Sequence, residues 1–184
     1  MTWLSSSKAA RNYTPDEREV IEGYRTPAHA QVFLNSLAYF NSREDVVNSF
    51  RRALRQRKVN CLEGALTAVA ILENYGHRPT ILDLVSSEDD EADHVVFAYE
   101  HNNKLGAIGR SRDNHLQSRP PIYLSEEELA RSYFDAFKTA KGYLKKFRII
   151  DLDRIRRFDW RFSSRNLIGL DHYMQDMRHR ILRP

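Results

Sequence analysis

The stretch VNCLEGALTAVAILENYG, Val59–Gly76, decides the fold of this chain. Its apolar residues cover most of a helical circumference, which predicts a central, buried helix from about Asn60 to Tyr75. Gly76 is typical of the residue that ends such a helix. The one cysteine of the chain, Cys61, lies in the predicted first turn, where backbone N–H groups lack intrahelical acceptors. Cys61 is therefore either a nucleophile or a small residue of the core.

Helix start signals predict further helices on both sides of the central one. Two threonines precede prolines, which suits an N-cap followed by the first helical position. Two serines are followed three positions on by an acidic residue, which approaches a capping box. The four predicted N-caps are Thr14, Thr26, Ser42 and Ser125. We expect the helix that follows Thr26 to continue to residue 40, and the Arg-rich C-terminal segments to be helical.

The strands are expected to follow the central helix. Residues 78–87 read as a short strand, and residues 94–112 read as a hairpin with its turn at Asn102 and Asn103. Residues 118–123, SRPPIY, must be extended around their prolines. A further short strand is expected near Ile149. The order of helices, antiparallel strands and helices predicts an α+β fold rather than alternating βαβ units.

Length and composition favour one domain. The chain has 184 residues, 41% of them hydrophobic, which is enough for a sizeable core. We expect a single domain over residues 1–184, with a core of about 42–150 and helical extensions at both ends. A lone cysteine excludes an internal disulfide and a Cys-based zinc site, and it favours a reducing compartment.

No sequence signal points to a membrane. Residues 1–12 are polar and lack the apolar run of a signal peptide, and no stretch approaches the roughly 20 apolar residues of a membrane span. We therefore expect a soluble, cytoplasmic protein that does not bind membranes. The sequence does not indicate an oligomeric state.

The charged segments suggest solvated surface more than a ligand site. The net charge of +4 permits an anionic partner but is mild, and no nucleic-acid-binding motif accompanies the arginines. The acidic loop, with Glu88, Asp89, Asp90, Glu91 and Asp93, lacks the ligand spacing of an EF-hand. We expect neither a metal nor a cofactor, and we expect Gln56, a possible oxyanion donor upstream of Cys61, to be a surface residue.

Cysteine catalysis needs a thiolate and a base. A helix N-terminus beside an imidazolium stabilises a thiolate, and its N–H groups can bind an oxyanion. His94 opens a predicted strand at a sheet edge, where a site can form. It is the candidate base by elimination, because the other histidines lie in helices, turns or loops with no obvious route to Cys61: His29, His77, His101, His115, His172 and His179.

A third group would orient the imidazole. If the hairpin turn is centred between Asn102 and Asn103, residue 94 lies opposite Ser111, and Asp113 is the next residue on the same face. A bulge at Gly106 or Gly109 would shift this register and bring Arg110 or Arg112 into line instead. Ser111 and Asp113 are therefore both candidates.

The order NCLEGALTAVAILENYG … DHVVFAYEHNNKLGAIGRSR resembles the transglutaminase-like superfamily of papain-type Cys-His thiol enzymes. That superfamily has a Cys at the start of a central helix, a His on the first strand of an antiparallel sheet and an Asp on the next strand. The resemblance covers about Val59 to Phe137 and is closest to a group of uncharacterised bacterial transglutaminase-like proteins. It implies a papain/transglutaminase-like fold, with the Cys helix packed on the sheet and surrounded by helices.

The resemblance implies that Cys61 is the nucleophile and His94 the general base. It also shows a departure, because Ser111 stands about where the superfamily has Asp, and a hydroxyl stabilises imidazolium less than a carboxylate does. We expect a thiol hydrolase or acyltransferase acting on an amide or ester, with a protein or peptide as substrate. The alternatives are a catalytically inactive domain of the same fold that binds a protein or peptide, and a basic nucleic-acid-associated module.

Overall fold

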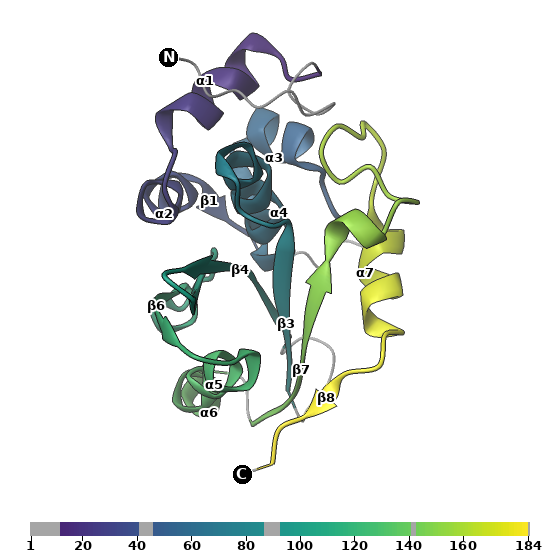
Figure 1. Ribbon diagram of the computed structural model, residues 1–184. Helices are drawn as coiled ribbons and strands as arrows, with labels where there is room; N and C mark the ends of the chain where they lie inside the picture. Colours follow the sequence, from purple (N-terminus) through teal and green to yellow (C-terminus); the bar gives the residue numbers. More distant parts are fainter. Residues whose placement is uncertain (1–11, 41–45, 87–92, 141–142, 184) are drawn as a thin grey trace.

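The computed structural model describes residues 12–40, 46–86, 93–140 and 143–183, and it has an α+β fold (Figure 1). An antiparallel six-stranded sheet runs in the order β6-β5-β4-β3-β7-β8. The helices are α1 (Pro15–Gly23), α2 (Pro27–Ser36), α3 (Phe50–Gln56), α4 (Cys61–Leu72), α5 (Glu126–Arg131), α6 (Phe134–Ala140) and α7 (Ile168–Gln175). The strands are β1 (Ala38–Tyr39), β2 (Lys58–Val59), β3 (Thr80–Ser86), β4 (His94–His101), β5 (Lys104–Ile108), β6 (Ser118–Tyr123), β7 (Leu144–Asp151) and β8 (Arg180–Ile181).

The predicted central helix is confirmed as α4. All of its residues from Leu62 to Leu72 are buried, and it continues through a short 3-10 turn, η2 (Glu73–Tyr75), to Gly76 at a positive φ of 87°. Figure 1 shows α4 between the N-terminal helices and the sheet. A helix that is apolar on every side needs such a layer on each face.

The N-cap residues in the sequence predicted the starts of three helices correctly. The side chains of Thr14, Thr26 and Ser125 accept hydrogen bonds from backbone N–H groups of the first turns of α1, α2 and α5. The prediction that a helix starts directly after Ser42 was wrong, because α3 begins at Phe50 and its N-cap is Ser49. Residues 46–49 are not helical, and Ser42 lies outside the described residues.

Two predicted helix ends also differ from the structure. The helix after Thr26 ends at Ser36 rather than at residue 40, because residues 38–39 form β1 and pair in parallel with β2. The helix after Ser125 is interrupted before Phe134, where α6 begins. The Arg-rich C-terminal region was predicted to be helical. Residues 156–166 instead form turns, bends and irregular backbone, and the α-helix of this region is the short α7.

The hairpin register agrees with the prediction from sequence. Asn102 and Asn103 both have positive φ, at 52° and 60°, which a tight hairpin turn of this kind requires. The pairs run regularly from His101 opposite Lys104 to Phe97 opposite Ile108. The bulge considered at Gly106 is absent from this ladder, and Gly109 lies beyond its last pair. Near Gly106 a shift does occur, but on the other side of β5, against β6.

The two faces of the sheet bury different sets of side chains. Val95 and Phe97 of β4 pack in the cluster that contains α4, whereas Val96 and Ala98 pack in a second cluster with α5 and α6. This alternation follows from the two-residue period of a strand. Within the described residues, no helix is long and apolar enough to cross a membrane.

Gly64 allows α4 to approach the segment after β5. A Cβ added at Gly64 would lie 2.9 Å from Arg110 Cβ and 3.4 Å from the Arg110 backbone nitrogen. Gly109 is tight in the same way, since a Cβ there would lie 2.8 Å from Val96 Cγ1. Close packing therefore requires a glycine at both positions.

We predict that Gly64→Ala lowers the free energy of unfolding by about 1–3 kcal/mol, because overpacking outweighs the gain in helix propensity. Denaturant unfolding measures this change. The matched control is Gly23→Ala, because a Cβ at Gly23 in α1 would meet nothing within 4 Å. Equal stability of the two variants would mean that the contact with Arg110 yields without cost.

The C-terminal segment is attached to the sheet through a buried ion pair. His179 Nε2 lies 2.9 Å from Asp83 Oδ2 on β3, and His179 Nδ1 lies 2.7 Å from the Met177 carbonyl oxygen. Because both ring nitrogens face acceptors, the charged imidazolium is favoured. The hydrogen bond to Asp83 raises the pKa of His179, against the opposing effect of burial.

A raised pKa in the folded state stabilises the fold below the unfolded-state value of about 6.5 and stops doing so as pH rises through the folded value. We predict that His179→Gln destabilises the protein most near pH 6 and progressively less toward pH 9. Urea unfolding across this range measures the difference, with His172→Gln on the exposed face of α7 as the control. A difference that does not vary with pH would contradict a charged His179.

Candidate active site

Cys61 is the first residue of α4 and is partly exposed. The N-cap Asn60 accepts a hydrogen bond from the Glu63 N–H at 2.9 Å, and Glu63 Oε2 accepts from the Asn60 N–H at 3.1 Å. This capping box fixes the helix start at Asn60. It also directs the helix dipole and the first-turn N–H groups at the region around the Cys61 thiol.

A buried carboxylate holds the segment before α3 against the start of α4. Glu63 is fully buried, and its Oε1 accepts from the backbone N–H and side-chain amide of Asn48 at 2.7 and 2.8 Å. Burial raises the pKa of Glu63, while these N–H donors oppose the rise. The Asn48 amide also lies within hydrogen-bond distance of Gln56, which is exposed as expected.

Tyr39 and two arginines surround the start of α4. Burial is the main cause that raises the pKa of Tyr39 to about 12, and negative charge on Cys61 adds to the rise. The positive charges of Arg112 and Arg110 oppose it. The Arg110 guanidinium lies 5.7 Å from the centroid of the Tyr39 ring. Tyr39 reaches this position because β1 pairs with β2, which directly precedes Asn60. The structure thus gathers a phenol and Arg110 at the start of α4, and Arg112 lies close enough to Tyr39 to lower the pKa of its hydroxyl.

Cys61 lies toward the His94 end of the sheet. Gly109 packs against Val96, near the start of β4, and the next residue, Arg110, is the neighbour of Gly64. The other end of α4 leads to β3, where the Thr80 hydroxyl donates to the Ala98 carbonyl. Cys61 therefore lies three residues beyond Gly64, ~4.5 Å along the helix axis, in the direction of the first residue of β4.

His94 is fully buried, and its ring is held by a backbone carbonyl. Nε2 lies 2.7 Å from the Leu116 oxygen, and the ring centroid lies 6.3 Å from that of Tyr133. A carbonyl only accepts, so Nε2 carries a proton and Nδ1 is the nitrogen that gains or loses one. The contact with Tyr133 puts the imidazole at the edge of the second cluster, at the first residue of β4.

Sequence reasoning missed Leu116, because a carbonyl oxygen leaves no signature in residue type. The signal that could have indicated it is Asp113 before Asn114, a turn-forming pair that starts a short 3-10 helix, η4 (Asn114–Leu116). Asp113 Oδ1 accepts from the His115 N–H at 2.8 Å and so caps η4. Asp113 therefore shapes the turn that presents the Leu116 carbonyl.

Ser111 lies opposite His94 if the hairpin register is continued, and it is buried. Its hydroxyl accepts from the Asp113 N–H at 3.2 Å. Its carbonyl accepts from Gln117 Nε2 at 2.9 Å and from the Arg110 guanidinium at 2.6 Å. The loop from residue 109 to residue 117 therefore joins the group around Cys61 to the group around His94.

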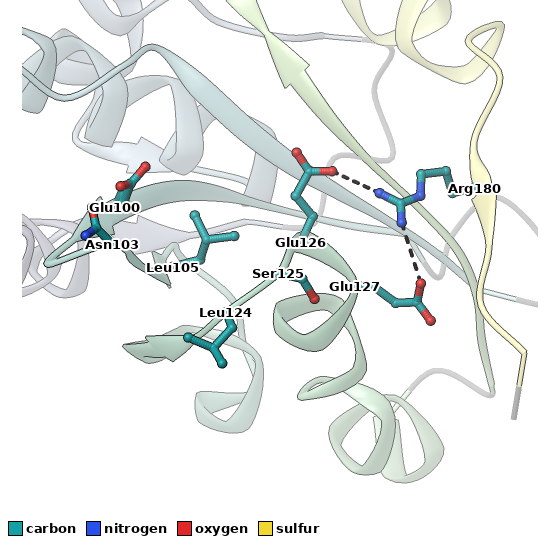
Figure 2. Close-up of a pocket in the computed structure, with 8 residues that line it drawn as sticks. All are labelled: Glu100, Asn103, Leu105, Leu124, Ser125, Glu126, Glu127 and Arg180. Carbon is teal, nitrogen blue, oxygen red and sulfur yellow. Dashed lines mark hydrogen bonds and ion pairs between the residues drawn. The ribbon is translucent and has the colours of Figure 1, made fainter.

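Two hollows of the described surface lie at the other end of the sheet. One, of about 520 Å³, is lined by the hairpin tip and the start of α5, and Arg180 bridges Glu126 and Glu127 beside it (Figure 2). A second, of about 1000 Å³, shares Glu100 and Arg180 with it and extends along β7. None of the four candidate site residues lines either hollow. Among the acidic loop residues, 88–91 lie outside the described residues.

A sequence model of the vasohibin family matches residues 46–178, well over half of the chain. The chain belongs to the vasohibin family. Vasohibins are transglutaminase-like cysteine proteases, so the superfamily inferred from the sequence is confirmed at that level, as is the papain-like arrangement of helix and sheet. The vasohibin match begins before α3 and includes α4, the whole hairpin and the loop 109–117.

A curated relative extends the comparison to archaea. A protein of Methanocaldococcus jannaschii, named only as uncharacterized, is 25% identical over 141 residues, which is 76% of this chain and 25% of that protein. The chain therefore spans about a quarter of the length of the relative. This relative is archaeal, whereas the sequence resemblance had pointed to bacterial proteins.

Proposed function

We propose that this vasohibin-family chain is a cysteine hydrolase or acyltransferase that cleaves an amide or ester bond of a protein or peptide through Cys61 and His94. The observation that carries the proposal is the position of Cys61, partly exposed at the capped N-terminus of the central helix. That N-terminus lies toward the end of the sheet where the ring of His94 is fixed by a carbonyl. The cytoplasm would keep this single thiol reduced.

The chemistry follows from the groups around each residue. The Cys61 thiolate attacks the carbonyl carbon, and the electron pair of the C=O bond moves to oxygen. First-turn N–H groups and the Tyr39 hydroxyl, which stays protonated at neutral pH, are the donors available to that oxyanion. Arg110 and Arg112 add positive charge that favours a thiolate.

His94 completes the proton balance. As the tetrahedral intermediate collapses, the bond to the leaving group breaks, and that group takes a proton from His94 Nδ1. Water, or an acceptor amine, then attacks the thioester and gives back one proton to the imidazole as the Cys61 thiolate is released. Leu116 keeps the proton on Nε2 throughout.

A second candidate is an inactive domain of the same fold that binds a protein or peptide. The complete burial of His94, with its ring beside Tyr133, favours this interpretation. The two functions differ in the reactivity of Cys61, which is directly measurable because the chain has one thiol.

We predict that native Cys61 reacts with iodoacetamide at pH 6.5 at least about tenfold faster than the same thiol in the denatured chain, whose pKa is near 8.5. Mass spectrometry of the single adduct gives both rates. His94→Ala should remove the enhancement, whereas His101→Ala, at the exposed end of β4, should not. Native labelling slower than denatured labelling would identify Cys61 as a structural residue.

We also predict that Ser111→Ala and Asp113→Asn each keep Cys61 reactivity within about threefold of wild type, because a backbone carbonyl holds the His94 ring and neither substitution removes it. The same alkylation assay measures this. A loss as large as that of His94→Ala in one variant would assign the orienting role to that side chain.

A further inference from the structure

Gln31 of α2 forms two hydrogen bonds with the backbone of one distant residue. Its Nε2 donates to the Gly109 carbonyl at 2.9 Å, and its Oε1 accepts from the Gly109 N–H at 3.1 Å. The two residues are 78 positions apart. A side-chain amide has the donor and acceptor of a peptide group, so Gln31 replaces a neighbouring strand at Gly109.

Gly109 is the first residue after β5, where strand pairing stops. β6 pairs with β5 no further than Ile108, opposite Ser118, and residues 109–117 then run without a strand partner until β6. Val96 leaves no room for a side chain at Gly109. The position of the loop 109–117 therefore depends on contacts made by its backbone.

The same helix also holds the next residue of the loop. The Arg110 side chain donates through Nε to the carbonyl of Leu37, directly after α2, at 3.2 Å. Arg110 is also the residue that packs on Gly64 of α4. A shift at Gly109 would thus move Arg110 relative to the first turn of α4, and it would move Ser111 with it.

We propose that Gln31 is a positioning residue for the Cys61 site, because its amide fixes the loop 109–117 against the start of α4. The role rests on the proposed function, since it is exerted on Cys61 chemistry. Gln31 is half-buried and touches the loop backbone, and its second amide N–H donates to Asn35 on the same helix at 2.8 Å. Asn35 is therefore a neighbour that can be altered without touching Gly109.

The test compares three variants in the iodoacetamide assay. Gln31→Met keeps the length of the side chain but removes both bonds to Gly109, and it should slow Cys61 alkylation at pH 6.5 by roughly tenfold, as the loss of one or two net hydrogen bonds allows. Asn35→Ala should leave the rate unchanged. Gln31→Glu should resemble Gln31→Met at neutral pH, because a carboxylate cannot donate to the Gly109 carbonyl.

The pH profile separates positioning from general stability. When the carboxyl group introduced by Gln31→Glu is protonated, it has one donor and one acceptor, like the amide that it replaces. The rate of Gln31→Glu relative to Gln31→Met should therefore recover as pH falls from about 7 toward 4. Should Gln31→Met fail to fold, the rate of Gln31→Glu relative to wild type over the same range carries the test, and a constant ratio overturns the proposal.

The outcomes distinguish the two hypotheses. A wild-type rate no faster than that of the denatured thiol contradicts the proposed function. An enhanced wild-type rate that persists in Gln31→Met contradicts only the role of Gln31. Amide hydrogen exchange at Gly109 adds a measurement that is independent of the thiol. Exchange should be faster in Gln31→Met than in Asn35→Ala. Equal exchange in the two variants would show that Gln31 does not hold the Gly109 backbone and would overturn the proposal.

Discussion

The close approach of α4 to the backbone after β5 is the constraint on which the rest of the structure depends. Because Gly64 has no side chain, α4 lies against Arg110, which follows the residue that packs on Val96 near the start of β4. The complete burial of α4 then requires a sheet on one side and helices on the other. The partly exposed Cys61 is thus the end of an otherwise buried element, which is why an accessible thiol and a well-packed core can coexist in one helix.

Much of the fold could be predicted from sequence because its signals are local. The caps at Thr14, Thr26 and Ser125, the Asn102–Asn103 turn and the C-cap at Gly76 each depend on a few adjacent residues, and each is found in the structure. The errors arose where distant contacts prevailed. Residues 38–39 leave the helical path because β2 offers them a strand partner, and Val47 is fixed outside a helix by hydrogen bonds to Asn166 and Leu167.

The site was less predictable than the fold for a related reason. Cys61 and His94 could be selected by residue type and by their positions at element starts, and their pairing stays a prediction. The surroundings could not be anticipated: the Leu116 carbonyl and the Gly109 backbone carry no side-chain signature, and Tyr39 comes from a two-residue strand far upstream.

The position of β7 has a consequence for how the chain acquires this structure during synthesis. β7 pairs with β3 along its whole length, Thr80 with Asp151 at one end, so neighbours in the sheet are separated by about 70 residues of chain. Until β7 has left the ribosome, β3 is an open edge beside a finished hairpin, with unpaired backbone groups exposed to other chains. The nascent protein therefore passes through a stage in which its thiol-bearing helix is complete but its sheet is not. Shielding of that edge by a chaperone would matter most at this stage.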